Sequence, residues 1–253
     1  MDHKYQQIAA TLSESLNLSQ PPLAVCFTAT APAGVAHHDG RVAAGCVFWQ
    51  EGTRGAFVTS AEDHSLCSIG VHTHNLEPGP AHQAELGTAL KVFAELGYLR
   101  AEDVGSVPVL KSRPAHVVYA PLADAPAAPD VVLLFVTATA ALVVSEACQQ
   151  VEGGNPPAMG RPACAAIPQV INTDSAAYSL GCCGARAYLD VLSENVALYA
   201  LPGNKLAAYT ERVKILSDAN KLLTRFHEIR RSDVAAGKSP TINESLAALQ
   251  ARG

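Results

Sequence analysis

The chain has 253 residues, of which 49% are hydrophobic and 16% are charged, and its formal net charge is −5 at pH 7. A chain of this length and composition can bury a substantial core, as one large domain or two small ones, and is not disordered by composition. The acidic balance and the scattered lysines and arginines exclude the basic surface that nucleic-acid binding requires.

The start of the chain and its longest apolar run indicate which cellular compartment to expect. Met1–Ile8 lacks the apolar run and the small-residue cleavage site of a secretory signal. The longest apolar run, 131–144, is too short to span a bilayer and contains Thr137 and Thr139. We therefore expect a soluble, cytoplasmic protein without a membrane segment. In that reducing compartment seven cysteines, an odd number, are not expected to form a disulfide framework.

Helices and strands are predicted in an order without regular alternation. Helical periodicity and capping signals predict helices at 3–17, 81–97, 139–151 with Thr139 as its N-cap, 186–193 and 204–231, and from 239 onward. They also predict a short helix within 42–52 that has Cys46 near its start. Short apolar runs predict strands at 23–30, 56–59, 107–110, 117–120, 131–137 and 196–201. The clearest helix is 81–97, with Leu86, Leu90 and Phe93 on one face and Gly97 as its end.

The order of these elements is repeated along the chain. Each half reads as strand, connection, cysteine, short helix, short strand and cysteine, and a Pro- and Ala-rich linker at 121–129 separates the halves. The sequence therefore predicts an α+β fold of two pseudo-duplicated, mixed α/β halves with a helical C-terminal tail. We expect a single domain over 1–253, with the internal repeats at 22–121 and 130–202 and the tail at 203–253.

Four cysteines occupy matching places in the two halves. Cys46 and Cys67 are separated by 21 positions, and Cys164 and Cys182 by 18. If the halves pack about a pseudo-two-fold axis, these thiols meet at one site. Thiolates select zinc, copper(I) or iron–sulfur clusters, and the close cysteine pairs typical of structural zinc sites are absent from the sequence. The pattern favours a 4Fe–4S cluster, with zinc as the alternative.

The remaining cysteines are interpreted differently. Cys26 and Cys148 lie within apolar segments and are expected in the core. Cys183 adjoins Cys182 and is either a spare thiol or the ligand in its place. If only three cysteines bind, the free iron becomes a Lewis acid, and the protein a lyase, dehydratase or desulfurising enzyme.

Two further residues are candidates for contact with the cofactor. His64 precedes Cys67 by three residues and is expected to hydrogen-bond to cluster sulfur or to support a ligand. Arg186 follows Cys182 by four residues and is expected to bind an anionic ligand, to offset the charge of a thiolate cluster, or to form an ordinary salt bridge. The pair His72 and His74 is interpreted as surface-loop histidines, because the segment is rich in Gly and Pro.

Five motifs are spread over about residues 20–230: Pro22–Val25, Cys46, Glu62–Cys67, Gly160–Cys164 and Ser179–Arg186. In these motifs the chain resembles the domain-of-unknown-function family 169, an uncharacterised archaeal cysteine-rich family. The family pattern of a cysteine, one residue, a glycine and an arginine two residues further on places the last ligand on Cys182. The cysteine pattern of the family implies an iron–sulfur role. Many members carry a lysine where this chain has Cys26.

These observations predict a 4Fe–4S protein with a redox or electron-transfer role. Its expected partner is a small-molecule substrate or a redox partner protein, with no nucleic acid and no membrane, and self-association is left open. The alternative class is a non-catalytic module that zinc or buried thiols stabilise and that binds a protein partner. The substrate and the redox partner are not predicted.

Overall fold

The computed structural model describes residues 3–76 and 79–251, so that the last two residues of the predicted tail lie outside the described part. The strands of its mixed sheet are β1 (Leu23–Thr28), β2 (Phe57–Ser60), β3 (His116–Pro121), β4 (Val131–Thr137), β5 (Ala158–Met159), β6 (Ala177–Ser179) and β7 (Val196–Pro202). The α-helices are α1 (His3–Leu16), α2 (Val47–Gly52), α3 (Ser68–Thr73), α4 (Pro80–Glu95), α5 (Ala138–Val151), α6 (Ala166–Thr173), α7 (Cys183–Tyr188), α8 (Leu206–Ala235) and α9 (Ile242–Ala251).

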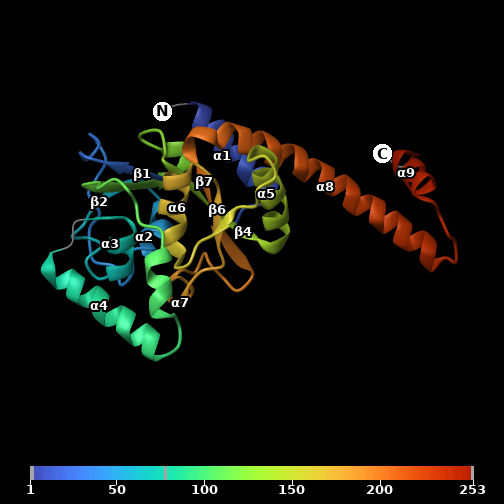
Figure 1. Cartoon of the computed structure of the whole chain (residues 1–253). Helices are drawn as coiled ribbons and strands as arrows, with labels where there is room; N and C mark the ends of the chain where they lie inside the picture. Colours follow the sequence, from blue (N-terminus) through green and yellow to red (C-terminus); the bar gives the residue numbers. More distant parts are fainter. Residues whose placement is uncertain (1–2, 77–78, 252–253) are drawn as a thin grey trace.

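Helices cover both faces of the sheet (Figure 1). On one face α1, α5 and α8 bury the first apolar cluster, and on the other α2, α3, α6 and α7 bury the second. Alternate residues of β4 belong to the two clusters: Val131, Leu133 and Phe135 to the second, Val132, Leu134 and Val136 to the first. Since successive side chains of a strand point to opposite faces, this explains why β4 is apolar at six consecutive positions.

The strand order of the sheet is symmetric about its centre. It runs β2-β3-β1-β4-β7-β6-β5 in the described chain, so that β1-β3-β2 in the first half corresponds to β4-β7-β6 in the second. The central strands β1 and β4 pair antiparallel, with Ala24 opposite Val132. In each half the first strand starts opposite a proline: Leu23 pairs with Pro121, and Val131 with Pro202. The predicted α+β fold of pseudo-duplicated halves with a helical tail is confirmed, whereas the domain limits stay a prediction.

Three local predictions were wrong. Residues 107–110 form no strand; Asn172 of α6 donates to the carbonyl oxygen of Val109 at 2.7 Å, and the amide of Leu110 donates to that of Thr73 at 2.9 Å. The N-cap of α5 is Thr137, whose hydroxyl accepts from the amide of Ala140, and not Thr139. The helix predicted at 186–193 begins earlier, at Cys183, and ends at Tyr188.

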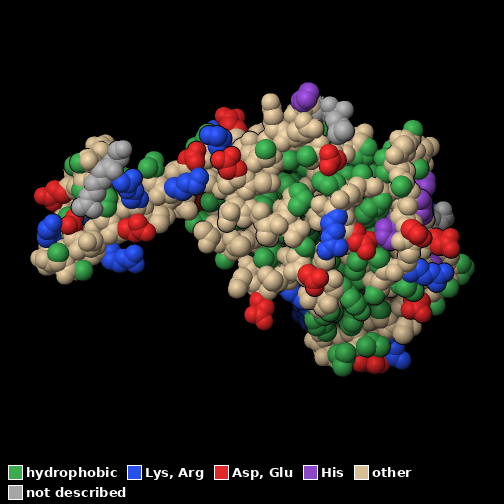
Figure 2. Space-filling view, turned by 180° about the vertical axis from the view of Figure 1, so that it is seen from behind, with side chains coloured by type: hydrophobic (Ala, Val, Ile, Leu, Met, Phe, Trp, Pro, Cys, Tyr) green, Lys and Arg blue, Asp and Glu red, His purple; other side chains and the backbone are tan. Residues whose placement is uncertain are grey.

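The tail projects from the body as a long helix (Figures 1 and 2). The first turns of α8 pack on α1 and α5, whereas its distal half buries Phe226 and Ile229 where α9 folds back. Arg230 donates to the carbonyl oxygen of Pro240 at 2.9 Å and thereby ties α9 to α8. No helix within residues 3–76 and 79–251 is long and apolar enough to cross a membrane.

The close approach of the end of β7 to the start of β4 predicts the effect of a glycine substitution. The amide of Gly203 donates to the carbonyl oxygen of Asp130 at 3.0 Å, and a Cβ at Gly203 would overlap the carbonyl oxygen of Pro129. We expect Gly203→Ala to lower the free energy of unfolding by roughly 3 kcal/mol or more in urea titrations, because backbone must move.

The matched control is Gly87→Ala, in α4, where a Cβ would meet no atom within 4 Å. It should leave the stability unchanged or raise it by up to about 1 kcal/mol, because alanine favours a helix. Equal unfolding midpoints for the two variants would contradict the close approach of these strands.

Candidate functional site

Four cysteines from both halves line one cavity. Cys46, Cys67 and Cys182 are the N-caps of α2, α3 and α7, and Cys164 lies in the short 3₁₀ helix Ala163–Ala165 that leads into α6. All four border a cavity of about 540 Å³. The pairing of β1 with β4 places matching connections side by side, which brings Cys46 and Cys67 together with Cys164 and Cys182.

The thiols of this site influence one another electrostatically. Burial raises the pKa of the Cys46 thiol to about 12, and the neighbouring Cys67 and Cys182 contribute to the rise. Burial also raises the pKa of Cys164, to which Cys67, Cys182 and Cys46 add, while a hydrogen bond with Thr73 acts in the opposite direction. The metal-free site therefore favours neutral thiols at Cys46 and Cys164.

The sulfurs surround the cavity instead of converging on one point. Among the described residues no three His, Cys, Asp or Glu side chains form a group that could hold a metal ion. Zinc binds sulfur at about 2.3 Å, which requires thiolates in mutual contact.

Glycines allow the backbone to approach the cysteines closely. Gly181 has φ +92°, and a Cβ there would lie 2.9 Å from Arg186 Nε. A Cβ at Gly70 would lie 3.0 Å from Cys67 Sγ. Side chains at these positions would displace the connections that carry Cys182 and Cys67.

Arg186 organises the connection that carries Cys182. Its Nε donates to the carbonyl oxygen of Leu180 at 2.8 Å, and its Nη1 to that of Leu192 at 3.1 Å. Further bonds run from Nη1 to Ser193 and from Nη2 to Leu180 and Val196. These bonds occupy all five N–H donors of the guanidinium. Arg186 therefore positions the loop, with no donor left for an anionic ligand.

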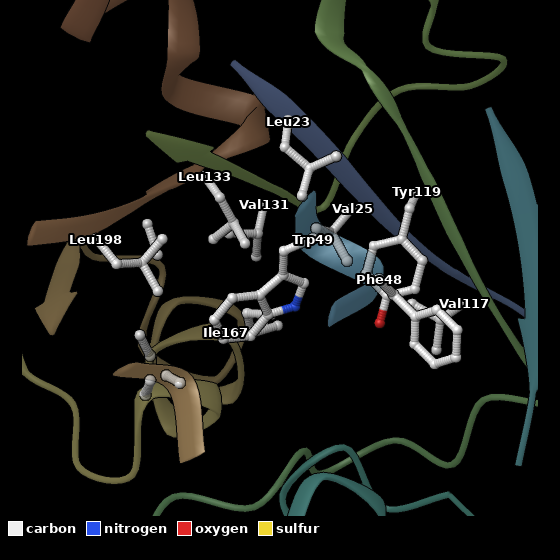
Figure 3. Close-up of a cluster of buried hydrophobic side chains, with 14 of the residues drawn as sticks. Leu23, Val25, Phe48, Trp49, Val117, Tyr119, Val131, Leu133, Ile167 and Leu198 are labelled. Carbon is white, nitrogen blue, oxygen red and sulfur yellow. The ribbon is translucent and has the colours of Figure 1, made fainter. Parts of the chain in front are cut away.

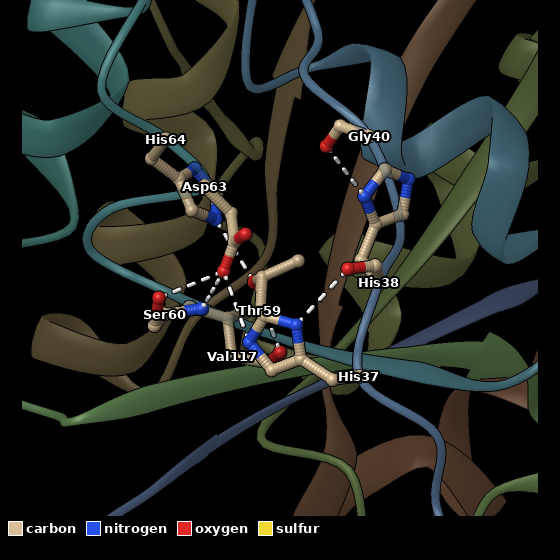
Figure 4. Close-up of polar contacts among 8 residues, drawn as sticks. All are labelled: His37, His38, Gly40, Thr59, Ser60, Asp63, His64 and Val117. Atoms are coloured by element: carbon tan, nitrogen blue, oxygen red, sulfur yellow. Dashed lines mark hydrogen bonds and ion pairs between the residues drawn. The ribbon is translucent and has the colours of Figure 1, made fainter.

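His64 is buried beside the connection that carries Cys46, and its ring bonds to Thr59 (Figure 4). The hydroxyl of Thr59 donates to the carbonyl oxygen of Val117 at 3.1 Å, so it accepts from His64 Nε2 at 3.0 Å. Nδ1 then carries the lone pair; it has no partner among the described residues, and a Cβ on Gly45 would lie 2.9 Å from it. Burial lowers the pKa of His64 to about 3, with His74 and His38 adding to the shift. The neutral ring therefore has a hydrogen-bond acceptor, the lone pair of Nδ1, next to Gly45, the residue before Cys46.

His74 and Tyr119 add buried polar atoms beside the thiols. Neither ring nitrogen of His74 makes a hydrogen bond of good geometry in the described chain, and its side chain is 2% exposed. Burial lowers the pKa of His74 to about 4, while the backbone of Cys164 acts in the opposite direction. The Tyr119 hydroxyl is buried and has no hydrogen-bond partner among the described residues, and its pKa is raised by burial and by Cys67, Cys46 and Cys164. Figure 3 shows its ring beside Phe48.

The sequence interpretation of His74 as a surface-loop residue was therefore wrong. His74 follows Val71 by three residues at the end of α3, and both side chains are 2% exposed. This helical spacing from an apolar residue was the signal for burial. Tyr119 gave no signal, because an aromatic residue in an apolar strand is typical of any core.

The other cysteines lie as their local sequence indicates. Cys26 and Cys148 are buried at 3% and 0% exposure, apart from the cavity. Cys183 is exposed and also lines the cavity, whereas Cys182 packs against the buried cluster. The backbone amide of Cys183 donates to the Tyr98 hydroxyl at 3.2 Å.

Comparison with known proteins places the chain in a family. The model of the DUF169 family, described as uncharacterised ArCR, matches residues 11–212, which include both halves and all four cysteines of the site. No curated protein and no solved structure matches the chain significantly. Since the match covers most of the sequence, the chain belongs to the DUF169 family.

Proposed function

We propose that the chain holds one 4Fe–4S cluster on Cys46, Cys67, Cys164 and Cys182 and serves a redox or electron-transfer role. The observation that supports this proposal is that four cysteines, two from each half, line one cavity. Thiolates are the ligands of iron–sulfur clusters, and four of them complete the ligand set of a 4Fe–4S cluster. The cluster, when bound, would supply one-electron chemistry.

A buried hydrogen-bond donor beside the thiols also supports the proposal. The O–H of Tyr119 is a buried donor without a partner in the described chain, whereas His74 already interacts by a hydrogen bond with the backbone of Cys164. An unsatisfied buried donor costs about 1–3 kcal/mol, and cluster sulfurs are acceptors that would relieve this cost. His64 Nδ1 has no hydrogen to donate in its neutral form. The proposed hydrogen bond to sulfur therefore passes to Tyr119.

Two alternatives make different demands on the same residues. A zinc-stabilised module that binds a protein partner requires the thiols to move inwards to a single ion. A lyase or desulfurase with one open iron requires one of the four thiols to be dispensable. Arg186 and the glycines support the ligand loops in all three cases.

Metal analysis of cysteine variants tests the ligand set. Protein purified without oxygen should be brown and contain about four irons and four sulfides per chain. Cys46→Ala, Cys67→Ala, Cys164→Ala and Cys182→Ala should each lose most of this iron, because each removes one ligand. The controls Cys26→Ala, Cys148→Ala and Cys183→Ala should keep it.

Each other result has a defined meaning. Colourless protein with one zinc supports the module. Equal iron in all seven variants removes the proposed site. Retention in one of the four ligand variants alone supports an open iron.

Tyr119→Phe tests the proposed donor to the cluster, because it should have opposite effects on the two forms. In the metal-free chain the unfolding free energy should stay the same or rise by about 1 kcal/mol, because an unsatisfied hydroxyl is removed. In the cluster-loaded chain, redox titration should give a more negative potential, because a hydrogen bond to sulfur is lost.

Tyr209→Phe is the matched control, since the Tyr209 hydroxyl donates to Glu152 on the opposite face of the sheet. It should lower the unfolding free energy by about 1–2 kcal/mol and leave the potential unchanged. An unchanged potential in Tyr119→Phe would remove Tyr119 from the site.

Arg186→Lys tests the positioning of Cys182. Lysine cannot span four carbonyl oxygens in one plane, so the variant should lose about 1–2 kcal/mol of stability and release iron faster under a chelator. The control Arg54→Lys, at an exposed arginine of the α2–β2 connection, should match the wild type. Wild-type iron release from Arg186→Lys would show that the loop holds Cys182 without these bonds.

A further inference from the structure

The cavity extends from the thiols to an apolar wall that no group of the described chain covers. Its far side is formed by α4 and by the 3₁₀ helix Ala101–Ser106 that follows. Leu86, Leu90 and Phe93 lie on one face of α4 and line the cavity, and none of them is fully buried. An amphipathic helix normally buries such a stripe against a core. Here the stripe faces the cavity.

The contacts of α4 show that its apolar stripe is not needed to hold the body together. No residue of α4 is fully buried, and its main helix contact is α3. Figure 2 shows hydrophobic side chains gathered at the end of the body where Figure 1 places α4. An apolar molecule in the cavity would remove this stripe from contact with water, and this burial of apolar surface favours binding.

Among the described residues that line the cavity, Arg161 is the charged side chain that no opposite charge compensates. Arg161 and Asp103 are the arginine and the carboxylate among these residues. Hydrogen bonds from Arg100, at 2.8 Å and 2.6 Å, lower the pKa of Asp103, with a smaller effect of Arg161, so that its charge is already compensated. Arg161 forms no ion pair within 4 Å among the described residues.

The guanidinium of Arg161 is held in place with donors to spare. Its Nη2 donates to the carbonyl oxygen of Tyr98 at 2.6 Å, and the group lies 4.7 Å from the centre of the Tyr98 ring. This is its one hydrogen bond within residues 3–76 and 79–251. A planar guanidinium with free N–H groups matches the two oxygens of a carboxylate, and a single arginine suits a monoanion better than a phosphate dianion.

We propose that this cavity binds a small carboxylate with an apolar body, its carboxylate on Arg161 and its body against Leu86, Leu90 and Phe93. The volume of about 540 Å³ lies within the range of pockets for such ligands. The other end of the ligand would face the thiols. As a binding site the proposal stands alone; as the substrate class of the cluster it rests on the proposed function.

Calorimetric titration with 4-phenylbutyrate and with its neutral amide, 4-phenylbutyramide, tests the proposal on both the metal-free and the cluster-loaded chain. Wild type should bind one phenylbutyrate per chain and bind the amide about tenfold more weakly, because the amide cannot pair with a charged guanidinium. Arg161→Gln should remove this preference, whereas Arg54→Gln, outside the cavity, should keep it.

A second pair of variants tests the apolar wall. Leu90→Ser should weaken both ligands about fivefold or more, because apolar contact is lost. Leu96→Ser, at a neighbouring leucine that is 75% exposed, should change neither affinity. Neither change removes a buried side chain, so both variants should fold, which circular dichroism checks.

The outcomes separate this inference from the proposed function. No saturable binding to either form of the wild type, an Arg161→Gln variant that still prefers the carboxylate, or unchanged affinity in Leu90→Ser overturns the inference. Binding as expected in a chain that takes up no iron leaves the ligand site standing and removes the cluster. Iron uptake without binding removes the ligand site alone.

Discussion

The antiparallel pairing of β1 with β4 is the contact on which the arrangement of the site depends. With Ala24 opposite Val132, the two strands run antiparallel, and the chain after each contributes helices to the same face of the sheet: α2 and α3 after β1, and α6 and α7 after β4. Each of these two segments brings two cysteines. Neither half holds a complete set of thiols, so the site exists only because the two central strands are hydrogen-bonded neighbours, about 4.8 Å apart, within one sheet.

The two faces of this sheet treat buried polar groups differently. On the face covered by α5 and α8, the hydroxyl of Tyr209 donates to Glu152, and that of Tyr199 bonds with Ser145 at 2.6 Å. On the cysteine face, the hydroxyl of Tyr119 is as deeply buried and has no partner within the described residues. Folded chains satisfy nearly all such groups. The two faces therefore differ in how their buried tyrosine hydroxyls are satisfied.

Much of the fold followed from the local sequence, because apolar periodicity and the Pro-rich linker reflect local geometry. The strand at 131–137 and the helix at 81–97 correspond closely to β4 and α4. The apolar run 107–110 misled, because its backbone bonds go to Asn172 and to α3, which no local pattern encodes. The residues of the candidate site were likewise predictable only in part. Matching cysteines could be found by repetition, whereas the burial of Tyr119 beside them depends on contacts across the sheet.

The segment that follows the second cysteine differs between the two halves, and this difference makes the lining of the cavity asymmetric. Between α3 and β3 the first half contains α4 and its connection, whereas the second half passes from α7 to β7 within a few residues. Tyr98, in the longer segment, contacts the other half twice: its hydroxyl accepts from the amide of Cys183, and its carbonyl oxygen accepts from Arg161. A symmetric thiol site is thereby covered from one side only.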